Sequence, residues 1–248
     1  MRKLMIAVGG SLVLAAPLAS ADVVGAGASV SYWNSDFSGE VVNKNSVNSA
    51  VDIENDLNMS SDGNANFTAS FEHPIPVLPN VRLNYTGISQ SGSGKIGAAA
   101  FDGILPGADV KSDLDIEQLD ATFYYEVLDN WVNLDLGLTA RKMDAELIVR
   151  DQTGSAKVSK TEVDAVLPMG YASVRFDLPF TGVSVGGEGN VISYSGDSLY
   201  DVNVYGQFDV AVLRLRAGYR EMAIDYEDDD DRLDVKLSGP FASIGVDF

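Results

Sequence analysis

The chain has 248 residues, no cysteine and a formal net charge of −19, with 36 acidic against 17 basic side chains. Without cysteine, neither disulfides nor thiolate metal sites can form. A surface this negative repels nucleic-acid phosphates and argues against nucleic acid as a partner. The length is typical of a single all-β domain.

The first 21 residues predict a cleaved secretory signal peptide. Basic residues at positions 2 and 3 precede an apolar run over 4–18 and a small-residue Ala-Ser-Ala cleavage pattern. The apolar run is interrupted by glycine and proline and is shorter than the ~20 residues that a membrane helix needs. We therefore expect residues 1–21 to be removed and residues 22–248 to form one barrel domain. An exported chain without disulfides needs a large core or a closed sheet for stability.

Alternation of apolar and polar side chains is the dominant pattern after residue 21, and it places successive side chains on opposite faces of a strand. Between 130 and 140, for example, Val132, Leu134 and Leu136 share one face, and the residues between them are polar. We predict an all-β protein of about ten antiparallel strands, with eight as the alternative count. The approximate ranges are 24–33, 65–73, 81–89, 116–127, 131–148, 163–178, 182–194, 198–210, 212–224 and 233–248.

The connections between these strands alternate in length, which is the pattern of a transmembrane outer-membrane β-barrel. The connections after the even-numbered strands are short, and those after the odd-numbered strands are mostly long and polar. An even strand count places both termini at the periplasmic end, and closure leaves no unpaired edge strand. Aromatic residues near predicted strand ends suggest interfacial girdles. The predicted girdle residues are Trp33, Phe71, Tyr85, Tyr125, Trp131, Phe176, Phe180, Phe208 and Phe248.

The final strand ends on an aromatic residue, Phe248, and carries apolar residues at alternating positions before it, among them Val246 and Ile244. This arrangement resembles the recognition signal of bacterial outer-membrane barrels. It implies that the barrel-assembly machinery binds the C-terminal strand. The expected location is the bacterial outer membrane, and the expected partners are its lipids and lipopolysaccharide.

The only histidine lies in FEHPIPVLPN, residues 71–80, which contains three prolines at positions 74, 76 and 79. Proline fixes its own φ and has no N–H, so this stretch cannot be paired strand. We interpret His73, Pro74, Pro76 and Pro79 as a stiff periplasmic turn, with a structural role for the imidazole. Together with the following VRLNYTGISQSGSG, the stretch resembles a family of proteobacterial outer-membrane proteins with an EHP-P-LPN-R turn. That resemblance implies fold and location, and it supplies no activity.

The polar faces of the predicted strands carry charges of both signs, which would point into the barrel. Side chains nearly fill the interior of a small barrel, and unpaired buried charges are costly. We therefore predict an internal ion-pair network that plugs or narrows the lumen, with a charged narrow pore and a binding site as alternatives. The predicted network consists of Arg82, Asp120, Glu126, Asp135, Arg141, Arg175, Glu188, Arg214, Arg216 and Arg220, with Glu72 on the same face.

Three acidic stretches, 52–57, 109–117 and 226–234, are interpreted as solvated loops. Clustered carboxylates suit hard cations, but the last stretch lacks the spacing of a calcium loop. Weak divalent cation binding, shared with the phosphorylated lipid of the outer leaflet, is the functional alternative. The stretch VGGEGN, 185–190, has no helix after it, so its glycines are expected to relieve crowding in a strand and not to bind phosphate.

No catalytic constellation is evident in the sequence. The chain lacks G-x-S-x-G, and the single histidine is expected at the periplasmic end, away from any serine at the outer surface. No cofactor or metal is predicted. The favoured interpretation is a non-enzymatic barrel with a role in envelope structure or surface interaction. The alternatives are a small passive channel for hydrophilic solutes, an outer-membrane hydrolase and a soluble periplasmic β-protein.

Overall fold

A computed structural model describes residues 24–42, 51–59, 62–75, 77–97, 103–154, 157–228 and 231–248. The predicted signal peptide and Pro76 lie outside the described residues. No helix long and apolar enough to cross a membrane occurs in the described ranges. The strands are β1 (Gly25–Val42), β2 (Val51–Asp52), β3 (Asp62–Glu72), β4 (Asn80–Lys95), β5 (Asp109–Asp129), β6 (Val132–Asp151), β7 (Val158–Leu178), β8 (Val183–Tyr194), β9 (Asp197–Val210), β10 (Leu213–Asp228) and β11 (Asp231–Asp247).

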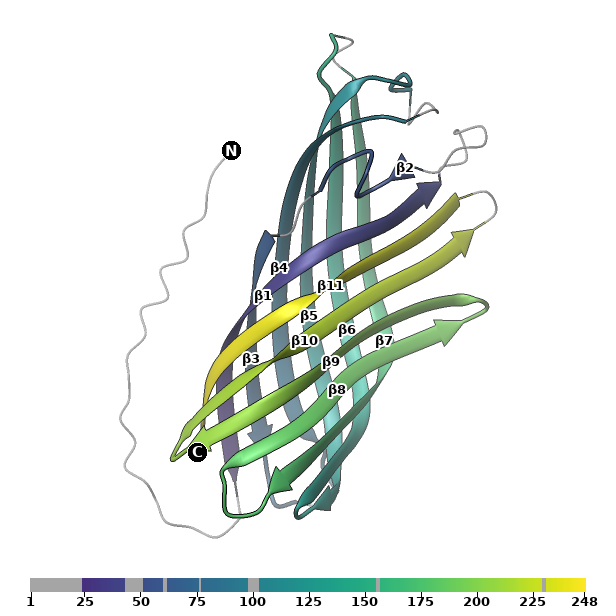
Figure 1. Cartoon of the computed structure of the whole chain (residues 1–248). Helices are drawn as coiled ribbons and strands as arrows, with labels where there is room; N and C mark the ends of the chain where they lie inside the picture. The colour runs from purple at the N-terminus through teal and green to yellow at the C-terminus, as the bar shows by residue number, and fades with distance from the viewer. Residues whose placement is uncertain are drawn as a thin grey trace, which may run out of the picture.

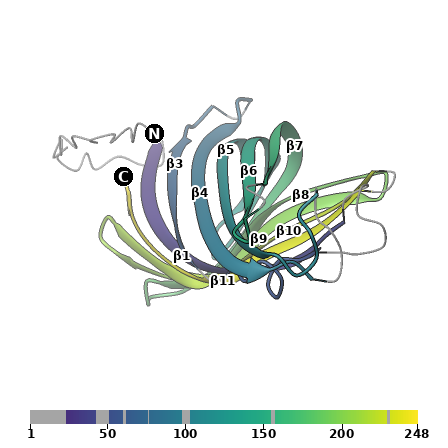
Figure 2. The same cartoon turned by 90° about the horizontal axis from the view of Figure 1, so that it is seen from above.

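Ten of these strands close into an antiparallel barrel, which confirms the predicted fold and favours ten strands over eight (Figures 1 and 2). Each long strand pairs with the next in the chain, and β1 pairs with both β3 and β11. Within the described ranges, the short β2 pairs only with the end of β1. Phe248 closes the seam by exchanging two backbone hydrogen bonds with Ala26, at 2.9 and 3.1 Å.

The connections segregate as the sequence predicts. Four short connections, 73–79, 130–131, 179–182 and 211–212, lie at one end, which we call the short-turn end. The remaining connections lie at the other end, which we call the long-loop end. In Figure 1 the short-turn end is at the bottom, together with the C-terminus.

Several strands are much longer than predicted, mainly toward the long-loop end. The strands β5 and β7 have 21 residues each, which at about 3.3 Å per residue gives a length of roughly 70 Å. A tilted strand needs only ~9–11 residues to cross a bilayer. The predicted loops over 90–95 and 109–115 were therefore wrong, because both stretches are strand. The acidic stretch at 226–234 was also wrong as a loop, since β10 runs to Asp228 and β11 begins at Asp231.

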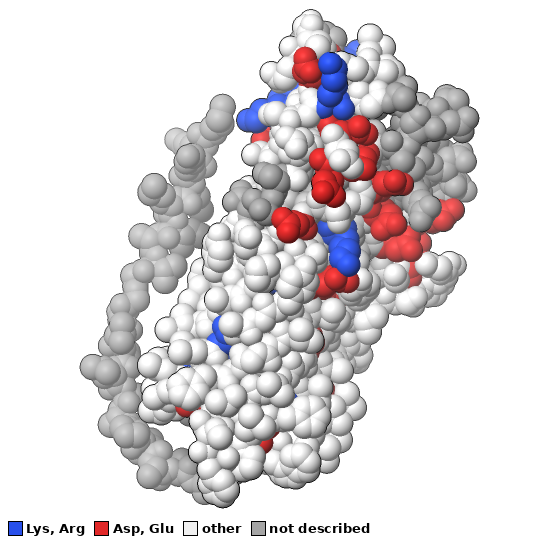
Figure 3. Space-filling model, viewed as in Figure 1, with Lys and Arg blue, Asp and Glu red and all other residues white. Residues whose placement is uncertain are grey.

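The reason is an inversion of the apolar face partway along the strands. In the lower part of β5, Leu119 and Phe123 point outward and are exposed, while Asp120 points inward and is buried. On the long-loop side of Gln118 the outward positions become charged and the inward positions become apolar. Glu117 points outward there, and Ile116 is buried inside. The barrel therefore has an apolar exterior around a polar lumen below, and a charged exterior around an apolar interior above. In Figure 3 the visible acidic residues gather over the upper half.

The apolar interior of the long-loop half is a compact hydrophobic core. Part of it comes from inward residues of the wall, such as Met143 and Leu237, and part from connections folded into the barrel. The connection over 51–59, which we call the plug loop, contributes four side chains, and the connection between β4 and β5 contributes three. These loop residues are Val51, Ile53, Leu57, Met59, Ile96, Ile104 and Ala108, all buried.

The plug loop is held by local hydrogen bonds. The carboxylate of Asp52 accepts bonds from the backbone N–H groups of Glu54 and Asn55, both at 2.9 Å, and from the Asn55 amide at 2.8 Å. The Asn55 side-chain hydrogen bond is the main reason why the pKa of Asp52 lies below its usual range. The loop lies directly on β4: the approach is so close that a Cβ on Gly94 would be 2.0 Å from the carbonyl oxygen of Asp56. Glycine there permits this close backbone approach.

The outward face of the short-turn half is a belt of exposed apolar side chains. Eight of the nine predicted girdle residues are exposed; seven lie near strand ends or in turns, and Tyr85 lies inside β4. The prediction that Trp33 belongs to the girdle was wrong. Trp33 points inward, is only 1% exposed and donates from Nε1 to the Gly239 carbonyl at 3.2 Å. Its neighbour Tyr32 takes the outward position, so Trp33 falls on the lumen side of the alternation.

Candidate functional site

Four inward charges at mid-height form a buried network that we call the lumen tetrad: Asp120 on β5, Arg141 on β6, Asp201 on β9 and Arg220 on β10. Arg141 donates from Nε and Nη2 to the two oxygens of Asp120, at 2.8 and 2.7 Å, and from Nη2 to Asp201 at 2.8 Å. Arg220 donates to both oxygens of Asp201, at 2.8 and 2.7 Å. Two cations and two anions balance, so the tetrad carries no net charge.

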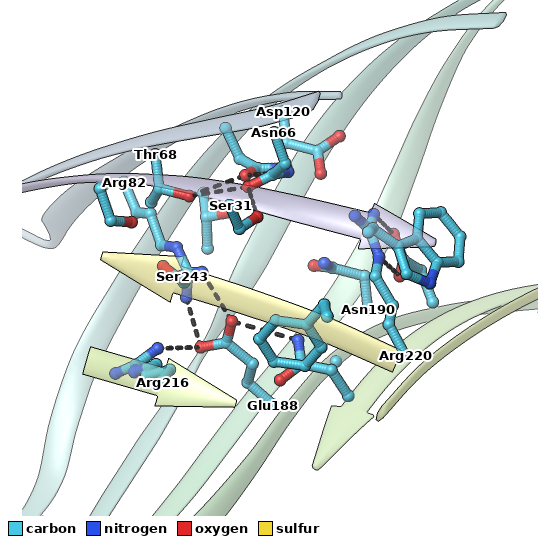
Figure 4. Close-up of a pocket in the computed structure, with 18 of the residues that line it drawn as sticks. Ser31, Asn66, Thr68, Arg82, Asp120, Glu188, Asn190, Arg216, Arg220 and Ser243 are labelled. Atoms are coloured by element: carbon cyan, nitrogen blue, oxygen red, sulfur yellow. Dashed lines mark hydrogen bonds and ion pairs between the residues drawn. The ribbon is translucent and has the colours of Figure 1, made fainter. Parts of the chain in front are cut away.

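A second cluster lies beside the tetrad (Figure 4). Arg82 on β4 donates two hydrogen bonds to Glu188 on β8, at 2.6 and 2.7 Å, and a third to the hydroxyl of Tyr171 at 3.1 Å. The Nη1 of Arg216 is 3.9 Å from the same Glu188 carboxylate, and its guanidinium lies 4.2 Å above the ring of Tyr205. Paired bidentate geometry of this kind makes the strongest charge-assisted hydrogen bonds.

Both clusters tie together strands that are not neighbours. Asp120 and Arg141 are direct partners on adjacent strands, but Arg141 reaches Asp201 with two strands in between. Arg82 reaches Glu188 with three strands in between. These contacts therefore cross the lumen and do not run along the wall.

The predicted network residues thus divide into three groups. Arg82, Glu188, Arg216, Asp120, Arg141 and Arg220 meet at mid-height, as described. Arg175 pairs with Asp177 at 2.9 Å, and Arg214 pairs with Asp247 at 3.0 Å, nearer the short-turn end. Glu126 and Asp135 face each other across β5 and β6, and neither forms a salt bridge with the residues that the structure describes. Glu72 accepts a hydrogen bond from Tyr124 at 2.8 Å.

Sequence reasoning missed Asp201, which joins the two arginines of the tetrad. The signal was present, because Asp201 lies on the polar face of its strand together with Asn203 and Gln207. It also missed the role of Trp33, whose ring lies under the guanidinium of Arg220 at 4.6 Å. An aromatic face stabilises a desolvated arginine in this position.

A cavity of about 70 Å³ lies among the two clusters. Its wall is polar and includes all four tetrad residues together with Arg82, Glu188, Ser31 and Asn203. Arg141 Nη1 and Asn203 Oδ1 are buried in this wall without a hydrogen-bond partner among the described residues. An occupant would have to accept from the first and donate to the second, as water does. The carboxylates of the cavity are held by arginines, and no histidine lines it.

The imidazole of His73 is used to build the turn between β3 and β4. Its backbone N–H donates to Asn80 Oδ1 at 3.0 Å, and its Nδ1 accepts from the N–H of Ile75 at 3.2 Å. Its Nε2 is 3.1 Å from the carbonyl oxygen of Pro79, which requires the proton on Nε2. Both ring nitrogens are therefore occupied by backbone groups of the turn.

A concentration of outward carboxylates lies on β5, β6 and β7, directly above the apolar belt. Asp115, Glu146 and Glu162 form one cross-strand row, and Glu117, Asp144 and Asp164 form the next. Lysines partly neutralise both rows: Lys142 donates to Asp144 at 2.9 Å, and Lys160 contacts Glu146 at 3.1 Å and also Glu162. No group of three or more potential ligands in the described ranges is arranged around a metal position.

No family model and no curated protein matches the chain. Among solved structures, the outer membrane protease OmpT of Escherichia coli is similar over 92% of this chain and 97% of that chain, with a TM-score of 0.55 and 10% identity. The translocator domain of the autotransporter NalP from Neisseria meningitidis covers 92% and 89%, with a TM-score of 0.44 and 10% identity. At such identity the first likeness shows the fold alone, which is that of a bacterial outer-membrane barrel.

Proposed function

We propose that this outer-membrane β-barrel is a closed, non-enzymatic protein with a role in envelope structure or surface interaction. The observation that carries the proposal is that the lumen is filled at two successive levels. The lower filling is charged and the upper is apolar, so they resist opening for different physical reasons.

The lower level consists of the lumen tetrad and the pair of Arg82 with Glu188. Separating these groups would leave desolvated charges unpaired, which costs about 3–5 kcal/mol for one buried pair. The upper level is the hydrophobic core that contains the plug loop. Removing Ile53 and Leu57 from that core would cost about 1.5–3 kcal/mol for each side chain exposed to water. An open path needs both changes at once.

The same architecture suggests the partners. Lipids of the outer membrane contact the apolar belt, and the carboxylate rows above it would lie beside the headgroups of lipopolysaccharide. Weakly held divalent cations could bridge the two. The C-terminal strand, with Ile244 and Val246 outward and Phe248 at its end, would be the segment that binds the assembly machinery.

A passive channel is the second candidate, because the mid-height cavity is polar. Single-channel recording in planar bilayers distinguishes the two. We expect no stable current from the native protein, and none from a variant whose plug loop is replaced by a glycine-serine linker of equal length. A variant with Arg82→Ala and Glu188→Ala together is also expected to be silent, because the upper level remains. A known porin under the same conditions provides the positive control.

A stable open current from the native protein, or from either variant alone, would refute closure at two levels. An outer-membrane hydrolase is tested separately, with purified protein and with lipid and peptide substrates. Because His73 is committed to backbone contacts, we expect no turnover above background from the native protein. Turnover that His73→Ala abolishes in folded protein would make the protein an enzyme.

A further inference from the structure

The turn between β3 and β4 has a composition that its role as a connection does not require. Its described apolar side chains are unusually exposed: Val77 is 81% exposed, Ile75 53% and Leu78 52%. Residues 74–79 contain no charged side chain. A hairpin connection in water needs only polar turn residues, so three apolar side chains at the tip call for another environment.

The backbone of the turn is also prepared for a medium without water. Pro74, Pro76 and Pro79 have no N–H to satisfy. The N–H groups of His73, Ile75 and Leu78 donate to Asn80 Oδ1, His73 Nδ1 and the Ile75 carbonyl respectively. Of residues 73–79, all except Val77 therefore either lack an N–H or donate it inside the turn.

Three carbonyl groups of the turn are also hydrogen-bonded, the first being that of Ile75, which accepts from Leu78. The Pro79 carbonyl is bonded to the His73 ring, and the Val77 carbonyl accepts from the hydroxyl of Tyr125 at 3.0 Å. Hydrocarbon tolerates backbone only where its polar groups are satisfied within the protein. Three N–H groups and three carbonyl groups of the turn meet that condition.

The contact with Tyr125 also fixes where the turn lies. Tyr125 points outward from β5, in line with the apolar residues Phe123 and Leu119 of the belt. Its hydroxyl therefore holds the turn against the outer, lipid-facing side of the barrel. The part of the turn that contains Val77 therefore lies beside the belt.

We propose that the described turn residues, 73–75 and 77–79, form a lipid-embedded foot, whose tip at Ile75, Val77 and Leu78 inserts into the periplasmic leaflet of the outer membrane. In this arrangement the histidine is the internal hydrogen-bonding partner that lets the backbone of the turn leave water. The foot anchors the short-turn end of the barrel at a fixed depth.

The absence of cysteine makes a site-specific test direct. Single cysteines at Val77, at Val204 in the apolar belt and at Ser195 in a turn at the long-loop end each receive an environment-sensitive fluorophore. The full-length mature protein is then reconstituted into phosphatidylcholine–phosphatidylglycerol vesicles with and without lipids brominated on the acyl chain. We expect brominated lipid to quench the Val77 label to an extent similar to the Val204 label, and the Ser195 label to be quenched only by aqueous iodide.

A second set of variants keeps the test independent of the label position. With the fluorophore at Ile75→Cys, Val77→Asp should reduce lipid quenching to the level at Ser195, because a charge drives the tip out of the leaflet. Val77→Thr, which keeps the shape, should retain most of the quenching. Each variant is used only if its unboiled form keeps the gel mobility of the folded barrel. If iodide quenches the Val77 label and brominated lipid does not, the proposal of a lipid-embedded foot is refuted. The apolar tip would then be a binding surface for a periplasmic protein.

Discussion

Replacing Arg141 by methionine removes the cation that holds both halves of the lumen tetrad together. The side chains of Arg141 and Asp120 are 0% and 3% exposed, so neither is screened by water. Asp120 would lose both of its hydrogen bonds to Arg141, whereas Asp201 would keep its two bonds from Arg220. The tetrad would pass from neutral to a net charge of minus one in a closed space.

The expected loss in unfolding free energy is about 3–5 kcal/mol, the cost of leaving one buried charge uncompensated. Asp120→Asn together with Arg141→Met restores neutrality, so the double variant should be more stable than Arg141→Met alone. The measurement is equilibrium urea unfolding of the folded barrel in lipid vesicles, followed by gel mobility without boiling. Lys142→Met is the matched control, since Lys142 is the next residue, points outward and is exposed.

The control should unfold at nearly the same urea concentration as the native protein, because exposed ion pairs contribute little. Two results would refute the reasoning. One is an Arg141→Met variant within about 1 kcal/mol of the native protein, which is the range of a solvent-screened pair. The other is a double variant that is no more stable than the single one.

Three further predictions concern the upper half and the two tryptophans. Gly94→Ala should loosen the plug loop, because the new Cβ would lie 2.0 Å from the Asp56 carbonyl oxygen; limited proteolysis of the folded barrel should then cut within 51–59, and an uncut loop would contradict the close contact. Since the folded pKa of Asp52 is lowered, its contribution to stability is present above the unfolded value of about 3.9 and is lost as the pH falls through the folded value. Melting between pH 6 and pH 3 should therefore change less in Asp52→Asn than in the native protein, and equal changes would argue against the linkage. Trp131→Phe leaves Trp33 as the single tryptophan, whose fluorescence should resist acrylamide, whereas Trp33→Phe leaves the 69% exposed Trp131, which should be quenched readily; equal quenching would place Trp33 outside the lumen.

The short-turn half could be predicted almost residue by residue. There one strand face meets a uniformly apolar surrounding, so alternation identifies both the strand and its outward side, as for Leu134 and Leu136. Three prolines around His73 identified the turn for a local reason, since proline cannot pair in a sheet. The local signals and the tertiary structure agree in this half, which is why the strand ends there were predicted within a few residues.

The long-loop half could not be predicted in the same way. Stretches such as 109–117 read as acidic loops, because their charged residues are conspicuous and their apolar residues are fewer. Their alternation is intact, but Val110, Leu114 and Ile116 belong to an interior that they share with the side chains of the plug loop. That interior is made by contacts between distant segments. The sequence of 51–59 gives no local sign that its apolar side chains turn inward.

The charged contacts across the lumen were predictable as a class and not as pairs. Alternation identified most of the inward charges, since Arg82, Arg141 and Glu188 all lie on polar strand faces. Which cation meets which anion depends on barrel closure and shear, which set the residues that oppose one another across the lumen. The neutral balance of the tetrad also depends on Asp201, which only the closed barrel brings near Arg141.

The change of apolar face within single strands fixes the depth at which the barrel sits in the membrane. A shift of the barrel by two residues toward the periplasm would carry Glu117, Asp144 and Asp164 into the hydrocarbon. An equal shift in the opposite direction would expose apolar side chains of the belt to water. Charged substitutions facing lipid cost up to about 2–4 kcal/mol at mid-depth for basic residues and less for acidic ones. Three such residues on adjacent strands would be submerged together. The position of the hydrocarbon boundary along the strands is thereby fixed to within one pair of side chains. A membrane of different thickness would have to adapt to the protein.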